Sequence, residues 1–375
     1  MTTDIKSLTR AEIEEQLKHW GEPAYRAGQV LDWLYRRRAA SWDAMSNLPK
    51  SLRSKLAAQF TLHTLTAVRQ QGAHDTTRKF LWRLPDGAFI ESVLIPANPA
   101  LYGEASDRHT LCVSTQVGCA YGCKFCASGL DGWKRNLGPE EIVEQALAVE
   151  RILVPDNRLL ATDSPQSPAT HQPARLVNNL VIMGMGEPLA NYDNLLKALR
   201  LLNAPWGGGI GARKITISTS GLAPQIRKLA AEPEQFRLAV SLHGATDDVR
   251  ARIMPVNRKY PIAELTAALA DYQRSKDQLI TFEYILIAGV NDSLDQTWPL
   301  AALARRLRAK VNLIPYNPVE GLQWARPEEA SCEAFLAALE KLEVTATLRR
   351  EKGGDIDAAC GQLRLKTERE LATGG

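Results

Sequence analysis

The spacing of hydrophobic residues changes period along the chain. Residues 8–60 place apolar side chains on two helical faces. The second stripe lies at residues 30–34, and the first consists of Leu8, Ile13, Leu17 and Trp20. Residues 78–96 instead contain two strand-like apolar runs on either side of Pro85-Asp86-Gly87, which predicts a β-hairpin. From residue 111 onward, strand and helix patterns alternate. The pattern therefore predicts a helical N-terminal part, a hairpin and a larger α/β part.

The alternating part predicts six βα units in a row, which favours parallel strands in a barrel or a doubly wound sheet. One further helix, at about 327–341, and a strand at 343–349 follow the last unit. The predicted strands are 111–117, 177–183, 214–219, 236–242, 280–287 and 311–316, and the predicted helices are about 139–153, 192–203, 223–231, 246–253, 261–274 and 294–308.

The domain boundaries that we expect follow these changes of pattern. Residues 1–75 form a helical accessory domain, 76–110 a hairpin and connector, 111–320 the α/β core, and 321–375 a C-terminal extension. Residues 155–175 are rich in Pro, Ser, Thr and Ala without an apolar period, which indicates a surface insertion.

Composition narrows the class of protein only moderately. The chain has 375 residues, of which 45% are apolar and 23% charged, as in ordinary globular proteins. The net charge of +4 permits a polyanionic partner without demanding one. No apolar run is typical of a signal peptide or a membrane span, so we expect a cytoplasmic protein that does not enter the membrane. Arg36, Arg37 and Arg38 fit either a solvated helix end or an RNA-phosphate patch.

The most specific motif is "GCAYGCKFCASG" at residues 118–129. It holds three of the six cysteines, Cys119, Cys123 and Cys126, directly after the first predicted strand of the core. Three thiolates can bind three irons of a [4Fe–4S] cluster and leave the fourth iron open for an outside ligand. A structural zinc site needs four ligands, and no fourth Cys or His follows at finger-like spacing. We therefore favour the cluster over zinc, and both over a disulfide.

Polar and glycine-containing segments follow four of the other predicted strands. They are "GMGEP" at 184–188, "STSG" at 218–221, "SLH" at 241–243 and "PYNP" at 315–318. Because the carboxyl ends of parallel strands meet at one edge, these segments and the cysteine loop should surround one ligand. Glu91, in the middle of a predicted hairpin strand, either faces solvent or belongs to a site.

The CxxxCxxC motif at this place, with Phe125 before the last cysteine, resembles the radical S-adenosylmethionine (SAM) superfamily. The blocks "TLCVSTQVGC", "MGMGEPL", "ITISTSGL", "VSLHG", "LIPYNP" and "GDIDAACGQL" further resemble the RlmN family, dual-specificity RNA methyltransferases that act on adenosine C2. The likeness covers nearly the whole chain from about residue 8. It implies an α/β fold, a partial (βα)6 radical SAM barrel with a small helical N-terminal domain and a β-hairpin extension.

The resemblance also implies a role for particular residues. Cys119, Cys123 and Cys126 would bind the [4Fe–4S] cluster, and SAM would occupy the open iron. Gly186 and Glu187 would meet the methionyl amino group of SAM. The other residues implied for the SAM pocket are Ser218, Ser241, Leu242, His243 and Asn317.

The family chemistry explains why two further cysteines are needed. Adenine C2 has no lone pair with which to attack the methyl group of SAM. In the family scheme, one SAM methylates a cysteine that matches Cys360, and a second SAM yields the radical that activates this methyl group. Glu91 matches the acceptor of the C2 proton, and Cys112 matches the thiol that releases the RNA as a disulfide forms. Cys332 matches no motif, and we expect it to be structural.

The substrates and partners are expectations of the same resemblance. They are 23S ribosomal RNA near the peptidyl-transferase centre, tRNA beside the anticodon, and a low-potential reductant such as flavodoxin or ferredoxin. We expect a monomer. Three alternatives remain open: a Cfr-type methylase acting on adenosine C8, a radical SAM activase, and a non-catalytic RNA-binding protein with a structural metal.

Overall fold

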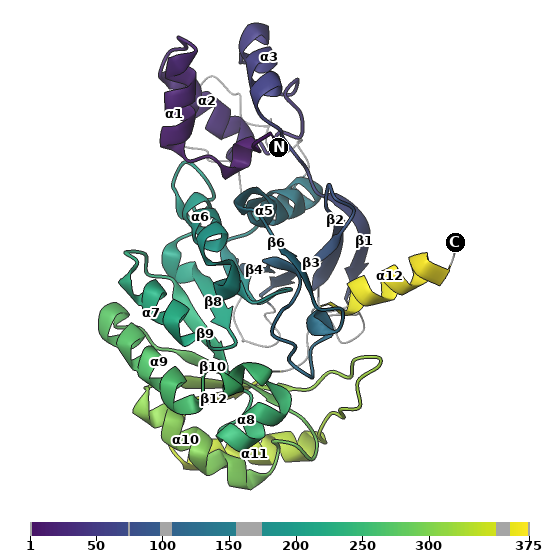
Figure 1. Ribbon diagram of the computed structural model, residues 1–375, viewed down its shortest axis with the longest axis vertical. Coiled ribbons are helices and arrows are strands. Elements are labelled where there is room, and N and C mark those ends of the chain that lie inside the picture. The colour runs from purple at the N-terminus through teal and green to yellow at the C-terminus, as the bar shows by residue number, and fades with distance from the viewer. Residues whose placement is uncertain (1, 74–75, 98–106, 155–174, 350–360, 374–375) are drawn as a thin grey trace.

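The N-terminal part is a small helical unit at one end of the molecule (Figure 1). The computed structural model describes residues 2–73, 76–97, 107–154, 175–349 and 361–373. A short 3-10 turn, η1 (Ile5–Ser7), is followed by α1 (Arg10–His19), α2 (Tyr25–Leu31), the π-helical turn η2 (Asp32–Arg36) and α3 (Lys50–Gln59). Thr9 and Glu12 form a reciprocal capping box, which fixes the start of α1. Ile13 and Leu17, on the predicted apolar stripe, are buried.

The described residues form a ten-stranded mixed sheet in which neighbouring strands follow one another in sequence. The first four strands pair antiparallel, and those from β4 onward pair parallel. The strands are β1 (Thr66–Gly72), β2 (Arg78–Arg83), β3 (Phe89–Pro96), β4 (His109–Cys112), β7 (Asn179–Ile182), β8 (Ile215–Thr219), β9 (Arg237–Ser241), β10 (Thr281–Leu286), β11 (Lys310–Pro315) and β12 (Ala346–Leu348).

Helices connect the parallel strands and lie along the outside of the sheet (Figure 1). They bury apolar faces against it, as the helical pattern requires. These helices are α5 (Pro139–Leu153), α6 (Tyr192–Asn203), α7 (Ala223–Ala231), α8 (Asp247–Ile253), α9 (Ile262–Lys276), α10 (Thr297–Arg306) and α11 (Glu329–Lys341). Short 3-10 turns lie at η3 (Ala127–Gly129), η5 (Pro188–Asn191), η6 (Ala212–Lys214), η7 (Pro255–Arg258) and η8 (Leu294–Gln296).

The predicted fold class is confirmed, with one correction at the first strand of the core. The predicted strand 111–117 divides in two, because β4 ends at Cys112 and β5 (Gln116–Gly118) pairs with β6 (Trp133–Asn136) in a separate two-stranded sheet. The buried Ser114 causes the chain to leave the main sheet there. Its hydroxyl donates to the backbone oxygen of Glu91 at 2.7 Å and accepts from the backbone N–H of Met185 at 2.9 Å.

Strand β6, strand β1 and helix α12 were not predicted. Strand β1 is mostly polar and half exposed, so it lacks an apolar alternation. Helix α12 (Gln362–Thr373) projects at the edge of the molecule opposite α7 and α9 (Figure 1). The predicted insertion at 155–175 lies, apart from Arg175, outside the described residues.

The three arginines after the second predicted stripe differ: Arg38 is buried and fits neither prediction, whereas Arg36 is partly exposed and Arg37 is exposed. Arg38 is 3% exposed, and its Nε lies 2.6 Å from Glu150 Oε2 on α5. Lys6 and Glu144 form a second buried pair at 2.8 Å across the same junction. Arg37 pairs with Asp32 at the surface. The N-terminal unit is therefore held to α5 by buried charge pairs.

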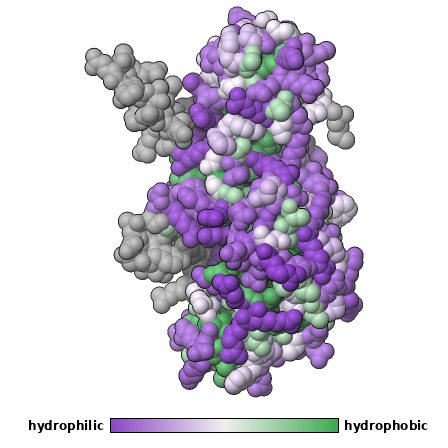
Figure 2. Space-filling view, turned by 90° about the vertical axis from the view of Figure 1, so that its left-hand side faces the viewer, coloured by the Kyte–Doolittle hydropathy of each residue, from purple (hydrophilic) through white to green (hydrophobic). Residues whose placement is uncertain are grey.

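The surface offers little apolar area on the face seen in Figure 2, where hydrophobic residues form small separate patches among hydrophilic ones. In the described part of the chain, no helix combines the length and apolar character needed to cross a membrane.

Candidate functional site

A cavity of about 360 Å³ opens at the carboxyl ends of the parallel strands. That volume is within the range of small-molecule sites, about 300–1,000 Å³. Residues from β4, β7, β8, β9, β10 and β11 or from the loops after them line it. Among them are the predicted site residues Cys112, Cys119, Cys123, Cys126, Gly186, Glu187, Ser218, Ser241, His243 and Asn317. Of the described residues predicted for the site, Leu242 and Glu91 lie outside the lining.

The three cysteines of the motif lie on one loop between β5 and β6, and each is partly exposed to the cavity. Burial raises the pKa of Cys119 to about 12, and the nearby Cys126 adds to this. Burial also raises the pKa of Cys123, with Cys126 and Cys119 as further causes. These thiols would repel one another as thiolates, so they need a cationic group in order to ionise together.

The three thiols of this loop fit the donor set of an iron–sulfur cluster. Within the described ranges, no three His, Cys, Asp or Glu side chains converge on one metal position. The sulfurs nevertheless interact electrostatically with one another. Three neighbouring thiols on one loop suit a [4Fe–4S] cluster, in which each thiolate binds a different iron.

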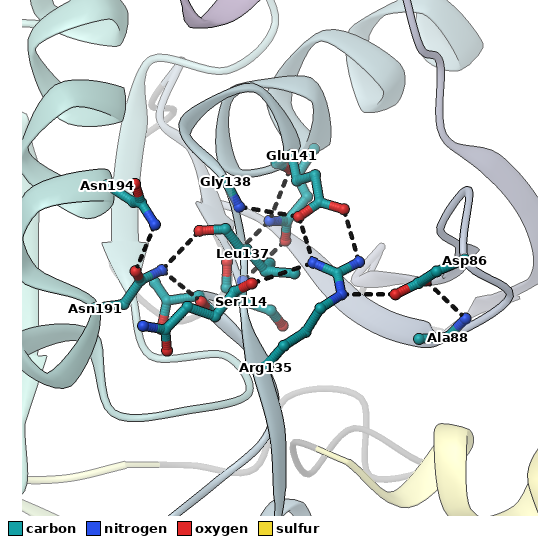
Figure 3. Close-up of polar contacts among 12 residues, drawn as sticks. Asp86, Ala88, Ser114, Arg135, Leu137, Gly138, Glu141, Asn191 and Asn194 are labelled. Atoms are coloured by element: carbon teal, nitrogen blue, oxygen red, sulfur yellow. Dashed lines mark hydrogen bonds and ion pairs between the residues drawn. The ribbon is translucent and has the colours of Figure 1, made fainter. Parts of the chain in front are cut away.

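The two-stranded sheet β5–β6 frames this loop, and Arg135 on β6 anchors it (Figure 3). Arg135 Nη1 and Nη2 donate to the two carboxylate oxygens of Glu141 at 2.7 and 2.8 Å. Its Nε donates to Asp86 Oδ2, in the β2–β3 turn, at 2.6 Å. On the other side, Asn191 Nδ2 donates to the backbone oxygens of Thr115 and Leu137 at 2.9 and 2.8 Å. The base of the cysteine loop is thus tied to three other elements.

The GEP segment (Gly186-Glu187-Pro188) after β7 lines the cavity with the backbone of Gly186 and the carboxylate of Glu187. Gly186 has φ +100°, and a Cβ there would lie 2.5 Å from the Cβ of Gln116, so only glycine fits without displacement. Glu187 is 3% exposed. Its carboxylate accepts from Thr219 Oγ1 at 2.8 Å and from the backbone N–H of Ser220 at 2.7 Å. Burial raises its pKa, and the hydrogen bonds from Ser220 and Thr219 oppose that rise.

His243, after β9, is held as a neutral ring. Its Nδ1 accepts a hydrogen bond from the backbone N–H of Ile285 at 3.0 Å, which places any ring proton on Nε2. Burial, and next the charge of Arg250, lower its pKa to about 3. Its ring meets that of Phe125 edge-on, with centroids 4.9 Å apart. The residue before Cys126 thus contacts the β9 loop.

The remaining predicted pocket residues contribute in different ways. Ser218 and Ser241 lie on β8 and β9 and line the cavity. Asn317 lines it as well, and its Oδ1 accepts from Arg326 Nη1 at 3.1 Å. Leu242 is 1% exposed, and its backbone oxygen accepts from Arg250 Nε at 3.0 Å. Because the Leu242 side chain is buried and does not line the cavity, this residue could contact a ligand there only through its backbone.

Of the three predicted catalytic residues, the structure describes Cys112 and Glu91, and of these two Cys112 lines the cavity. Cys112, at the end of β4, lines the cavity and is paired in register with Val93 on β3. Glu91 lies two residues earlier on β3 and is 3% exposed, so its solvent-facing reading is wrong. Cys360 lies outside the described residues, but the backbone N–H of the next residue, Gly361, donates to Glu91 Oε2 at 2.6 Å. Cys332 is buried in the core on α11, as predicted.

Three charged residues of this region were not singled out by the sequence reasoning. Lys79, on β2, is fully buried and pairs with Glu91 at 2.9 Å. Arg250, on α8, is fully buried and donates to the backbone oxygens of Leu242 and Ser220, which joins the β9 and β8 loops. Glu283, on β10, lines the cavity and accepts from Asn312 Nδ2 at 2.6 Å. A charged residue inside an otherwise apolar strand was the available signal for Lys79 and Glu283.

Comparisons with known proteins agree along the whole chain. Residues 3–62 match the ribosomal RNA large subunit methyltransferase N-terminal domain, and residues 173–297 match the radical SAM superfamily. A probable dual-specificity RNA methyltransferase RlmN of Akkermansia muciniphila is 52% identical over 97% of both chains. A probable RlmN of Desulfitobacterium hafniense is 43% identical over 98% of both chains.

A solved structure extends the similarity to three dimensions. The crystal structure of a radical SAM methyltransferase from Sphaerobacter thermophilus superposes with a TM-score of 0.84 at 44% identity, covering 96% of this chain and 98% of that one. Sequence, domain composition and fold therefore place this chain in the RlmN family of the radical SAM superfamily.

Proposed function

We propose that this protein methylates C2 of adenosine in 23S ribosomal RNA, near the peptidyl-transferase centre, and in tRNA beside the anticodon. The observation that carries the proposal is the cavity itself. It unites a three-cysteine loop, a buried carboxylate at the GEP segment and the thiol of Cys112, in a chain of the RlmN family. C2 carries no nucleophilic lone pair, so methylation there needs both a radical source and a thiol that carries the methyl group.

Cys119, Cys123 and Cys126 would hold the [4Fe–4S] cluster, which in its reduced state supplies the electron that cleaves SAM to a radical. Gly186 leaves room for the ligand to approach the backbone, and Glu187 offers a buried carboxylate to the amino group of SAM. Ser218, Ser241, Leu242, His243 and Asn317 would complete the pocket. The neutral His243 ring can donate only from Nε2.

The thiol chemistry would use two SAM molecules per turnover. The Cys360 thiolate attacks the methyl group of the first SAM, which gives S-methylcysteine. A 5′-deoxyadenosyl radical from the second SAM would take a hydrogen atom from that methyl group, and the methylene carbon would add to adenine C2 and link the protein to the RNA. The electron left over once C2 loses its proton would return to the oxidised cluster. Glu91 would accept the C2 proton. Cys112 would then attack the sulfur of Cys360, which forms a disulfide and releases methylated RNA.

Glu91 places a condition on this scheme. Both of its oxygens accept hydrogen bonds, from the backbone N–H groups of Gly361 and Arg364 at 2.6 Å each, and Lys79 lies 2.9 Å away. These three donors leave a lone pair on the carboxylate, but Glu91 does not line the cavity, so it would reach the C2 proton only after the start of α12 or its own side chain has moved.

The direct test is an assay after anaerobic reconstitution with iron and sulfide. A low-potential reductant, such as flavodoxin or ferredoxin, would be supplied together with unmodified 23S fragments and tRNA. We expect 2-methyladenosine in both RNAs by mass spectrometry, and protein that acts as a cytoplasmic monomer. Methylation at C8 would instead support the Cfr-type reaction, and colourless zinc-bound protein without SAM cleavage would contradict the proposal.

A further inference from the structure

The N-terminal end of α12 is docked on a buried ion pair of the β-hairpin. Lys79 Nζ lies 2.9 Å from Glu91 Oε2, and the two side chains are 0% and 3% exposed. The same Oε2 accepts from the N–H of Gly361, and Oε1 accepts from the N–H of Arg364. A helix leaves the N–H groups of its first turn unpaired within the helix. Glu91 therefore caps α12 from a residue 270 positions away along the chain.

The same end of α12 also lies against the cysteine loop. Gly361 has φ +86°, and a Cβ there would be 2.8 Å from the backbone nitrogen of Ser128, two residues after Cys126. Arg364 Nη1 donates to Asp131 Oδ2 at 2.9 Å and to Glu368 Oε2 at 2.6 Å. The start of α12 is thus fixed between β3 and the loop that carries the three cysteines.

A buried carboxylate holds this position only while a cation compensates it. An ionised carboxylate with little access to water is costly unless it is paired, and backbone N–H groups supply only partial charge. Lys79 supplies the full opposite charge from β2, since the Arg364 side chain is directed to Asp131 and Glu368 instead. Three donors on two oxygens also restrict the Glu91 carboxylate to one orientation.

We propose that Lys79 is a positioning residue for the C-terminal segment: it holds Glu91 as the anion that caps α12, and so sets where the chain next to Gly361 meets the cysteine loop. The proposal rests on the proposed function, in which Cys360, directly before Gly361, carries the methyl group. Lys79 itself is not required to touch SAM or RNA.

The test compares Lys79→Met, which keeps the length of the side chain without its charge, with Lys79→Arg, which restores the charge. Hydrogen exchange of the segment 361–371 reports docking of α12. The amount of SAM cleaved per adenosine methylated reports whether the methyl-bearing cysteine is in place. The matched control is Lys6→Met, since Lys6 forms an equally buried pair with Glu144 at the domain junction.

In Lys79→Met we expect exchange at the start of α12 to rise about ten-fold and the cleaved-to-methylated ratio to rise about ten-fold, as loss of a charge-assisted contact implies. Lys79→Arg should return both toward the wild type. Lys6→Met should leave both unchanged. A general loss of stability would lower cleavage and methylation together, so an unchanged ratio in Lys79→Met would overturn the proposal, as would the same rise in Lys6→Met.

If Lys79→Met does not fold, the double variant Lys79→Met/Glu91→Gln removes both charges of this pair and still reports exchange. Wild-type exchange at the start of α12 in that variant would overturn the proposal. If the wild-type protein cleaves SAM but methylates no RNA, the proposed function fails, and the exchange comparison still decides whether Lys79 positions α12.

Discussion

At the scale of single residues, His243 links stability to pH. Its pKa is lowered to about 3 in the folded protein, against 6.5 as the ordinary value, so the unfolded chain binds one proton more between these limits. Stability is therefore present above pH 6.5 and is lost as the pH falls toward 3. The slope due to one such proton approaches about 1.4 kcal/mol per pH unit.

The substitution His243→Asn tests this assignment. Asn tolerates the positive φ of 55° at this position, and its Oδ1 can accept from Ile285 as Nδ1 does, but it does not titrate. We expect the free energy of urea unfolding to fall less steeply in the variant than in the wild type between about pH 6 and about pH 5. Parallel curves for the two proteins would show that His243 is not the titrating group.

Glu187 gives a second prediction at this scale. Glu187→Gln keeps an oxygen that can accept from Thr219 Oγ1 or Ser220 N–H but removes the negative charge offered to an ammonium group. We expect the KM for SAM to rise about ten- to hundred-fold, as the loss of a charge-assisted hydrogen bond implies. Steady-state SAM cleavage measures this. A KM equal to that of the wild type would remove Glu187 from the SAM site.

Residue types and spacing were enough to find the cysteine loop and most of the cavity lining. They did not reveal Lys79 and Arg250, because these two side chains make contacts with residues distant in sequence. Arg250 meets the oxygen of Ser220, and Lys79 meets a carboxylate that also holds α12. Contacts of this kind have no local sequence pattern.

At the scale of elements, the sheet β5–β6 determines how firmly the cysteine loop is held. Arg135→Met would remove the bidentate contact to Glu141 and the bond to Asp86 while keeping much of the side-chain volume. We expect unfolding to cost about 1–3 kcal/mol less and iron retention after gel filtration to fall.

The control for Arg135 is Arg10→Met on α1, whose pair with Glu14 is exposed at 51% and 43%. Exposed pairs of this kind contribute about 0–1 kcal/mol, and we expect no loss of iron. Equal effects of the two substitutions would show that the Arg135 network does not secure the loop.

Helices with a strong periodic spacing of apolar residues were predicted from the sequence with bounds close to the observed ones. Helices α5, α6 and α7 have the expected bounds, because their apolar faces cover the sheet. Strand β4 ends before the predicted residue 117, because Ser114 pairs with the backbone on both sides and turns the chain. Helix α12 was missed because most of its residues are polar and the apolar contacts described for it are those of Leu363 and Leu365, while Glu91 holds its start from a distant strand.

At the scale of the whole molecule, buried charge pairs join the N-terminal unit to the barrel. In Arg38→Met, the Glu150 carboxylate would keep its bond from the backbone N–H of Val177 at 3.0 Å but would lose the cation paired with it. Breaking such a pair costs about 3–5 kcal/mol. We expect urea unfolding to shift to lower concentration, and Arg38→Met/Glu150→Gln to recover part of the loss. A double variant no more stable than the single one would contradict this explanation.

The proposed chemistry as a whole depends on a covalent link between Cys360 and the RNA. Its most direct measurement is a denaturing gel of Cys112→Ala after anaerobic turnover with SAM and unmodified RNA. Without the thiol that attacks Cys360, we expect the variant to remain bound to RNA as a slowly migrating band, with Cys360 identified as the attachment site by mass spectrometry and no such band in Cys360→Ala. Wild-type amounts of methylated adenosine from Cys112→Ala, without any band of this kind, would contradict the covalent scheme.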